Sequence, residues 1–257
     1  MQNLQLEPKV AIVTGSSRGL GRSTVLSLAG RGVDSIVTYY ANKAAADEVV
    51  HQAEKLNRKA LALQLDVSDI TTFTSFANEV SRVLKETWNR EKFDFLVNNA
   101  GTHASAPIGE ITEAQMDEMY NVHVKGVLFL TQALLPYMAD NGRIVNISSG
   151  LTRFSIPGSS VYASMKGAVE VLTRYMAKEL APRGIAVNTV APGAVETDFH
   201  GGMVRDDPDL NTLVASMTAM GRVGVPEDIG PMIASLLDGE NRWMTGQRLE
   251  VSGGMFL

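Results

Sequence analysis

The sequence predicts an α/β protein in which helices cover both faces of a doubly wound, seven-stranded parallel sheet. Seven short runs rich in β-branched residues alternate with longer amphipathic segments along the chain. Neighbouring parallel strands need a helix-sized connection, so this alternation is typical of a parallel sheet covered on both sides. Because no Pro-rich or Ser-rich linker and no internal repeat divides the chain, we expect a single domain over residues 1–257.

Each element follows from a local pattern. Strands are predicted at 10–14, 35–39, 60–65, 93–97, 143–147, 185–190 and 247–251, and helices at 19–31, 43–57, 70–88, 113–139, 160–183 and 226–237. Thr112 and Gln115 have capping-box spacing at the start of the fourth helix, and Pro226 suits the first turn of the last one. The segment 197–224 departs from the alternation because it is polar and punctuated by glycine, so we expect a surface excursion that forms a substrate lid.

The composition narrows the classes of function. The formal charge is −5 and the basic residues are scattered among acidic ones, so a nucleic-acid partner is not expected. The chain has no cysteine, which excludes disulfides, thiolate metal sites and a cysteine nucleophile, and we expect no metal site. The amino terminus lacks the basic leader and apolar run of a signal peptide, and no stretch approaches the roughly 18 apolar residues that span a membrane. We therefore expect a cytoplasmic protein with no membrane partner.

A glycine-rich turn follows the first predicted strand. Residues 14–21 read TGSSRGLG and lead directly into a helical pattern. Glycines at such a turn permit positive φ and let backbone amides approach a pyrophosphate, which then sits at the positive end of the helix dipole. This position in the chain favours dinucleotide binding over a purely structural turn.

Two titratable side chains share one face of the fifth predicted helix. Tyr162 and Lys166 have i, i+4 spacing, and Ser149 stands 13 residues before Tyr162. A second Tyr-x-x-x-Lys pair, Tyr39 and Lys43, lies at a strand end and has no serine at that distance. We therefore expect Tyr162 and Lys166 to act as a pair.

These motifs together resemble the short-chain dehydrogenase/reductase family. The resemblance rests on the TGxxxGxG pattern at 14–21, the NNAG run at 98–101, the set Ser149, Tyr162 and Lys166, and Pro192-Gly193 after the sixth strand. The matches span nearly the whole chain and agree in order and length with the short, single-domain branch of the family. The resemblance implies a Rossmann-type fold and an NAD(P)-dependent enzyme that acts on CH-OH and carbonyl groups.

The resemblance also implies a role for each catalytic side chain. Tyr162 is the general acid/base, Lys166 lowers its pKa and bonds the nicotinamide ribose, and Ser149 hydrogen-bonds the carbonyl oxygen of the substrate. A phenol titrates near pH ~10, so the lysine ammonium and the positive ring of an oxidised cofactor are expected to favour phenolate. Ser148, beside Ser149, is expected to be structural.

One position departs from the family pattern. The segment 123–127 aligns with the usual Asn-x-x-Gly-Val, which places His123 where the family has an asparagine whose backbone carbonyl holds a relay water. Asn121 is the alternative for this role if the helix is shifted. The alternative to a catalytic role for His123 is a packing role. In the catalytic role, its imidazole would introduce a titration near pH ~6.5.

The residues after the second predicted strand favour the phosphorylated cofactor. Enzymes that prefer NAD(H) commonly have an acidic residue there, whereas residues 39–43 read YYANK. Arg18 with Asn42 or Lys43 would contact a 2′-phosphate, so we expect NADP(H), with NAD(H) as the alternative. If Lys43 does not contact the cofactor, it is a solvated residue at the start of a helix.

The resemblance extends the cofactor site to the later strands. The pair at 66–67 resembles the adenine contact, although Asp66 would equally start a turn, and the run at 192–197 resembles the segment that holds the nicotinamide carboxamide. The full cofactor-binding set is Gly15, Ser17, Arg18, Gly19, Leu20, Gly21, Tyr40, Asn42, Lys43, Asp66, Val67, Asn99, Ala100, Gly101, Tyr162, Lys166, Pro192, Gly193, Val195 and Thr197.

These patterns together predict an NADP(H)-dependent oxidoreductase that interconverts a ketone or aldehyde and an alcohol. The candidate substrate contacts, each also compatible with packing or surface exposure, are His103, Phe154, Phe199, His200 and Met203. The alternatives are a 3-oxoacyl thioester reductase of fatty-acid type, which the segment 185–197 resembles, and a non-catalytic NADP-sensing regulatory protein. Ser252 stands where the family usually has an Asp, before the last glycines. The resemblance of the closing strand to the family implies a homotetramer or homodimer.

Overall fold

A computed structural model describes residues 8–257, and the sheet it contains confirms the predicted fold class. Seven parallel strands lie in the order β3-β2-β1-β4-β5-β6-β7. Their bounds are β1 Val10–Val13, β2 Asp34–Tyr39, β3 Ala60–Gln64, β4 Phe93–Asn98, β5 Met138–Ile147, β6 Ala186–Pro192 and β7 Arg248–Val251. Most of the segment on which the signal-peptide prediction rests, Met1 to Glu7, lies outside the described residues.

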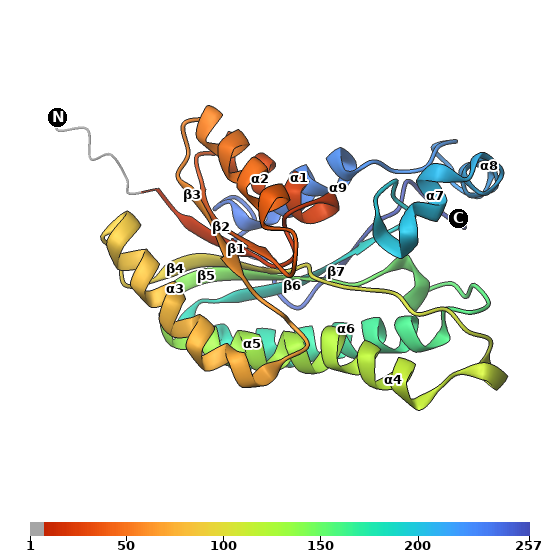
Figure 1. Ribbon diagram of the computed structural model, residues 1–257, viewed down its shortest axis with the longest axis horizontal. Coiled ribbons are helices and arrows are strands. Elements are labelled where there is room, and N and C mark those ends of the chain that lie inside the picture. Colours follow the sequence, from red (N-terminus) through yellow and green to blue (C-terminus); the bar gives the residue numbers. More distant parts are fainter. Residues whose placement is uncertain (1–7) are drawn as a thin grey trace.

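Helices cover both faces of the sheet, as Figure 1 shows. One face carries α1 (Gly19–Gly30), α2 (Lys43–Lys55) and α9 (Pro226–Leu237), and the other carries α3 (Phe73–Trp88), α5 (Gly126–Leu134) and α6 (Ser160–Leu180). Each face has its own buried cluster, in which alternate residues of one strand, such as Ile12 and Val13, point to opposite sides. The central strands are buried throughout, as expected for a parallel sheet with two covered faces.

The predicted helix 113–139 is wrong as one continuous element. The segment begins with α4 (Glu113–Tyr120), passes through a π-helical turn at Asn121–Lys125 and continues as α5. The predicted capping box of Thr112 and Gln115 is present at the start of α4. Pro136, which has no N–H to donate, lies in a 3₁₀ turn after α5, and β5 already begins at Met138. At Gly126 a Cβ atom would lie 2.2 Å from the carbonyl oxygen of Val67, so only glycine lets the helix approach the end of β3 this closely.

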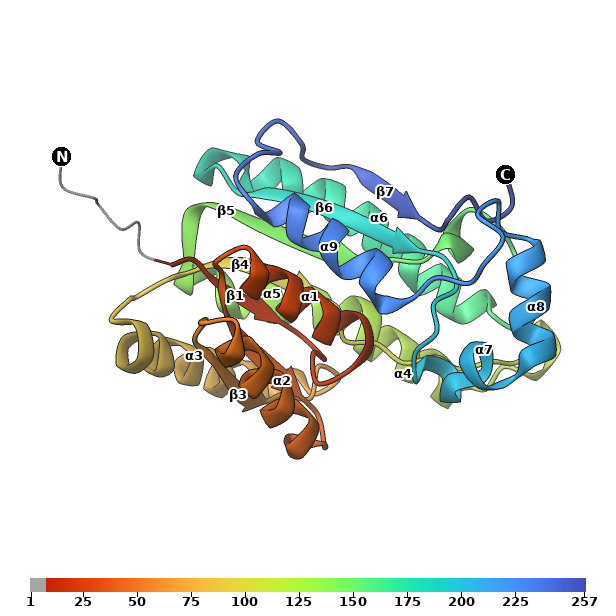
Figure 2. The same cartoon turned by 90° about the horizontal axis from the view of Figure 1, so that it is seen from above.

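The strand order reverses between β1 and β4, and this creates a crevice at the carboxyl ends of the strands. The segment 197–224 reaches beyond these ends and contains α7 (Met203–Asp206) and α8 (Pro208–Ser216). Figures 1 and 2 both show α7 and α8 at this end of the molecule, beside the carboxyl terminus. The segment is therefore partly helical, and Val214, Val223 and Met255 form a small buried cluster beneath it.

Across residues 8–257, no helix is both long enough and apolar enough to cross a membrane.

Candidate active site

Three buried side chains meet where β5 ends and α6 begins. Ser149 follows β5 by two residues and is 9% exposed, while Tyr162 and Lys166, in the first turns of α6, are 6% and 4% exposed. The predicted pair therefore does share one helix face, and this face is turned into the protein. Tyr39 and Lys43 lie in different elements, at the end of β2 and the start of α2.

Lys166 ties the helix to the strand. Its Nζ atom donates a hydrogen bond to the carbonyl oxygen of Ile147, the last residue of β5, at 2.7 Å. The same Nζ lies 5.6 Å from the ring centroid of Tyr162. Burial of the ammonium lowers the pKa of Lys166 to about 7, because desolvation disfavours its charged form.

The pKa of the Tyr162 phenol is raised, whereas the sequence predicted that it would be lowered. Burial raises its pKa above the ordinary value of 10.0, and the opposing contribution comes from a hydrogen bond with Ser149. The predicted lowering by Lys166 is not seen, because desolvation of the phenol dominates. In the protein alone, Tyr162 holds its proton at neutral pH.

Ser148 and Ser149 have different surroundings although they are adjacent. The hydroxyl of Ser148 donates to the carboxylate of Glu170 at 2.7 Å, whereas the hydroxyl of Ser149 accepts from the backbone N–H of Leu151 at 3.2 Å. The contact with Glu170 is the kind of structural role expected for Ser148.

The glycine turn packs against the NNAG run that follows β4. A Cβ atom on Gly15, whose φ is +60°, would lie 2.9 Å from the Cα of Ala100. The Thr14 hydroxyl accepts from the backbone N–H groups of Asn99 and Ala100, both at 2.9 Å. A Cβ on Gly21 would lie 2.6 Å from the Cα of Ser16, so the turn is tight enough to require glycine. The carboxyl ends of β1 and β4 are thereby held together at the switch point.

The start of α1 fits an anionic ligand. Arg18 is the N-cap residue of this helix, but its side chain accepts no hydrogen bond from the first turn. That turn contains no acidic residue. The backbone amides at the positive end of the helix dipole therefore suit a pyrophosphate. Thr197 lies beside this turn, since a Cβ on Gly19 would be 3.5 Å from its Cγ2 atom.

Comparison with known proteins identifies the family. The family model described as enoyl-(acyl carrier protein) reductase matches residues 15–256. An uncharacterized oxidoreductase of Methylorubrum extorquens is 38% identical over 98% of this chain and 99% of its own length. The hydroxynaphthalene reductase-like protein Arp2 of Metarhizium brunneum is 35% identical over 97% of this chain and 95% of its own. The chain belongs to the short-chain dehydrogenase/reductase family.

Solved structures of similar proteins agree in fold and chemistry. The promiscuous reductase LugOII, which catalyses keto-reduction at C1 during lugdunomycin biosynthesis, has a TM-score of 0.92 and 39% identity over 98% of this chain and all of its own. The angucycline C-6 ketoreductase LanV with bound NADP has a TM-score of 0.91 and 34% identity over 96% of this chain and 95% of its own. This short-chain dehydrogenase/reductase is an oxidoreductase that acts on carbonyl or hydroxyl groups.

The π-helical turn of this short-chain dehydrogenase/reductase places His123 beside Tyr162. His123 is 1% exposed, and its ring centroid lies 5.2 Å from that of Tyr162. Burial, with a smaller contribution from Lys166, lowers the pKa of His123 to about 2. The titration near pH ~6.5 that an imidazole would introduce is therefore not expected here, because the ring stays neutral.

The candidate contacts to a 2′-phosphate lie on the surface and already have partners. Arg18 is 3.5 Å from Asp198, and Lys43 forms an i, i+4 ion pair with Asp47 at 2.7 Å. The side chain of Asn42 accepts from Ala45 N–H at 3.0 Å and caps α2. Of these groups, Arg18 lies within the glycine turn itself, so it is the better placed cation.

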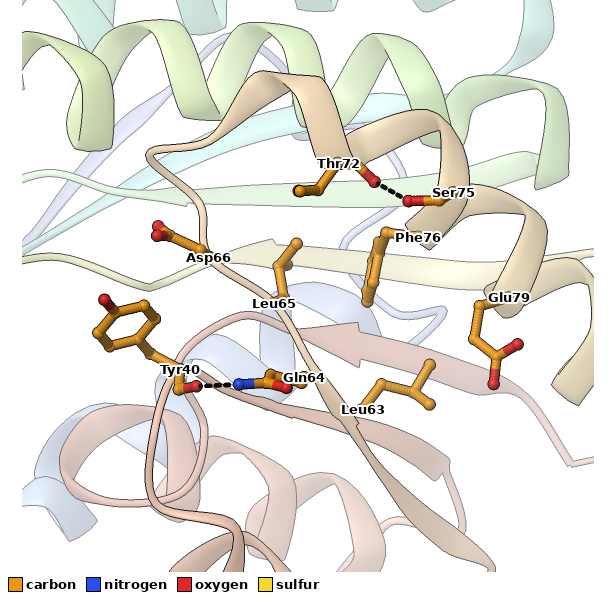
Figure 3. Close-up of a pocket in the computed structure, with 9 residues that line it drawn as sticks. All are labelled: Tyr40, Leu63, Gln64, Leu65, Asp66, Thr72, Ser75, Phe76 and Glu79. Atoms are coloured by element: carbon orange, nitrogen blue, oxygen red, sulfur yellow. Dashed lines mark hydrogen bonds between the residues drawn. The ribbon is translucent and has the colours of Figure 1, made fainter.

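A cavity of about 450 Å³ lies between β3 and α3. Figure 3 shows its lining side chains, with Tyr40 and Asp66 among them. Asp66 accepts from the N–H of Ser68 at 2.8 Å and from its hydroxyl at 2.6 Å, so it does start a turn. The remaining lining residues come from the end of β3 with Leu65, and from α3 with Thr72 just before it, and Ser149, Tyr162 and Lys166 are not among them. Val67 lies on the other side of the β3 end, against Gly126.

The segment after β6 packs tightly against β7. Gly193 N–H donates to Val251 O at 3.1 Å, and a Cβ on Gly193 would lie 2.8 Å from the Cα of Ser252. Val195 forms an isolated parallel bridge with Gly224, which closes the base of the segment 197–224. Ser252, which stands in place of the usual Asp, donates to the Glu250 carboxylate at 2.8 Å.

Only some of the predicted substrate contacts gather around Tyr162. The ring centroids of His103 and Phe199 lie 4.9 Å and 5.8 Å from that of Tyr162, and His200 stacks on His103 at 4.1 Å. Phe154 instead packs against Phe256 at 4.7 Å, in the cluster beneath α8. Met203 is 47% exposed at the start of α7.

Sequence reasoning missed a polar network behind Ser149. Arg248, on β7, donates to the carboxylate of Glu170 at 2.7 Å, to the Thr152 hydroxyl at 3.0 Å and to the Ser149 carbonyl oxygen at 3.3 Å. Glu170 also accepts from Ser148 and Thr152. The sequence offered no signal for this network, because its members come from elements up to about a hundred residues apart.

Proposed function

We propose that this protein is an NADP(H)-dependent ketoreductase in which Tyr162 is the general acid/base. The observation that carries the proposal is the burial of Ser149, Tyr162 and Lys166 together at the carboxyl end of β5, facing the crevice that the glycine turn also borders. A phenol, a hydroxyl and an ammonium in one buried group suit proton transfer to a carbonyl oxygen.

In the direction of reduction, Tyr162 gives its proton to the carbonyl oxygen, and the hydride for the carbonyl carbon comes from the nicotinamide ring when the cofactor is bound. The raised pKa of Tyr162 keeps the phenol in the proton-donating form at neutral pH. Ser149 hydrogen-bonds the same carbonyl oxygen, where negative charge grows. Lys166, held by Ile147, attracts the phenolate that remains.

The phosphorylated cofactor is supported by the charges around the glycine turn. No acidic side chain follows β2, and Arg18 lies in the turn where a 2′-phosphate would be neutralised. The relative LanV binds NADP in its solved structure. The predicted roles of the glycine turn, the NNAG run and the segment 192–197 belong to this proposal, as does the predicted lid at 197–224. The homotetramer and the cytoplasmic location stay predictions.

Reduction of a fatty-acid type thioester is the second candidate. It is favoured by the family model that matches the chain, since that model is described as enoyl-(acyl carrier protein) reductase, a name that refers to acyl chains on a carrier protein. Oxoacyl and enoyl thioesters therefore belong in the substrate panel beside simple ketones and aldehydes.

The test is absorbance at 340 nm with the purified protein, each reduced cofactor and this panel. Tyr162→Phe is expected to lower turnover by about 10²–10⁴-fold and to keep cofactor binding, because it removes only the transferable proton. Tyr175→Phe is the matched control, since Tyr175 lies on the same helix but is 65% exposed. Preferred turnover of a thioester would support the second candidate, and tight NADP binding with no turnover of any carbonyl would point to a regulatory protein instead.

A further inference from the structure

Aromatic rings from two distant segments lie against the phenol ring of Tyr162. His103 comes from the loop after β4, Phe199 and His200 come from the segment after β6, and Tyr162 itself comes from α6. The ring centroids of His103 and Phe199 lie 6.0 Å apart and cross at 77°, an edge-to-face arrangement. The reacting phenol is therefore walled by flat π-faces, which suit a flat, aromatic ligand.

His103 has an unused polar atom in this wall. Its Nδ1 atom is buried and has no hydrogen-bond partner. Buried polar atoms nearly always have a partner, so an unpartnered one beside an active site calls for an explanation. Burial and the neighbouring His200 lower the pKa of His103 to about 4, so the imidazole is neutral at pH 7 and offers one nitrogen lone pair to a donor.

The cation beside this wall is Lys166, whose Nζ lies 5.6 Å from the Tyr162 ring centroid and already donates to the carbonyl oxygen of Ile147. The arginines of the neighbouring segments are paired with carboxylates. Arg205 is bonded to both Asp198 and Asp206, and Arg18 pairs with Asp198 at 3.5 Å. Arg18 is assigned to the cofactor, and Arg205 would have to give up two carboxylate partners to bind an anionic substrate group. The charges around the rings therefore favour a neutral ligand that donates a hydrogen bond over a carboxylate or phosphate.

The backbone beneath His200 allows this wall to rearrange. His200 has a φ of +53°, which is unfavourable for a non-glycine residue, and Gly201 and Gly202 follow with φ of +70° and +78°. Because His200 is solvent-exposed and its neighbours are glycines, its ring is the member of the group that a ligand can replace on the face of His103.

We propose that the substrate is an aromatic ketone that carries a phenolic hydroxyl, and that this hydroxyl donates to Nδ1 of His103 while its ring packs against His103 and Phe199. His103 is then a specificity-determining residue. This inference rests on the proposed ketoreductase function. The names of two relatives, a hydroxynaphthalene reductase-like protein and an angucycline ketoreductase, refer to ring systems of the same chemical class.

The test compares α-tetralone with its ring-hydroxylated isomers in the NADPH oxidation assay. For the wild type, we expect kcat/KM for the best hydroxylated isomer to exceed that for α-tetralone about tenfold, the effect of one added hydrogen bond. His103→Phe keeps an aromatic ring and removes the acceptor, so this ratio should fall to about one. His103→Gln restores an acceptor and should recover part of the ratio, while His51→Phe, at an exposed imidazole on α2 outside the site, is the matched control and should preserve it.

The outcomes separate this inference from the function on which it rests. Equal kcat/KM for the two kinds of tetralone, or a preference that survives in His103→Phe, would overturn the role of His103 while the ketoreductase stands. Turnover of aliphatic ketones or thioesters without turnover of any tetralone would overturn the aromatic substrate class, while the proposed reductase function would stand. Failure to reduce any carbonyl compound with NADPH would overturn both.

Discussion

The Nε2 atom of His123 lies 2.8 Å from the carbonyl oxygen of Thr102. A carbonyl oxygen only accepts, so Nε2 carries the ring proton and donates it. This hydrogen bond joins the π-helical turn to the loop after β4, and the next residue of that loop is His103. The position where relatives usually have asparagine therefore holds the backbone beside the expected substrate.

His123 should make the protein sensitive to acid. In the unfolded chain an imidazole titrates near pH ~6.5, while burial lowers the pKa of His123 to about 2 in the folded protein. Below pH ~6.5 the unfolded state binds a proton that the folded state rejects, so stability falls as the pH falls. Between pH 7 and pH 5 this one group should cost about 2 kcal/mol.

Urea unfolding of the wild type and His123→Asn at both pH values checks this prediction. The variant should lose about 2 kcal/mol less than the wild type over the same interval. Because His103 also has a lowered pKa and lies next to Thr102, which His123 holds, the same comparison is repeated in a His103→Gln background. Parallel pH profiles for the two proteins would show that His123 is not buried as a neutral ring.

The two adjacent serines should differ in their effect on kcat when each is replaced by alanine. Ser149→Ala should lower kcat by about 10²–10³-fold, because it removes a donor to the developing oxyanion. It should also cost about 1 kcal/mol of stability, because the N–H of Leu151 loses its acceptor. Ser148→Ala should lower the free energy of unfolding by about 1 kcal/mol, because Glu170 loses one of its donors. Steady-state kinetics and thermal unfolding of both variants test the pair, and a loss of kcat confined to Ser148→Ala would exchange their roles.

Arg18 and Lys43 should differ in their effect on cofactor choice. Arg18→Ala should raise the KM for NADPH about tenfold and leave the KM for NADH nearly unchanged, because one charge-assisted bond to the 2′-phosphate is lost. Lys43→Ala should have a smaller effect, since that ammonium is paired with Asp47. Kinetics with both cofactors give the ratio, and equal losses for NADPH and NADH in Arg18→Ala would speak against a phosphate contact.

Arg248 should be a positioning residue for Ser149. Arg248→Met keeps much of the side-chain volume but removes the hydrogen bonds to Glu170, Thr152 and the Ser149 carbonyl oxygen, so stability should fall by about 2 kcal/mol. We also expect a lower kcat at an unchanged KM for NADPH. A merely structural role would change stability while kcat per folded molecule stayed the same.

The control for this variant is Arg174→Met. Arg174 is exposed on α6 and reaches only the backbone carbonyl of Glu170, at 3.3 Å. Its replacement should change stability by no more than about 0.5 kcal/mol, as is usual at exposed positions.

Local patterns in the sequence were sufficient for the sheet, most helices and the catalytic motif. The period of apolar residues distinguishes strand from helix, and the i, i+4 spacing of Tyr162 and Lys166 places them on one face in any α-helix. They failed at the helix 113–139, because the π-helical turn depends on how closely Gly126 approaches Val67, a residue on another element.

The order of residues along the chain was enough to name the chemical groups that this protein carries. The environment of those groups depends on the fold: the raised pKa of Tyr162, the neutral His123, and the ring wall of His103, Phe199 and His200. Desolvation and ring packing depend on neighbours brought together from distant segments, and Arg248 behind Ser149 is the plainest case.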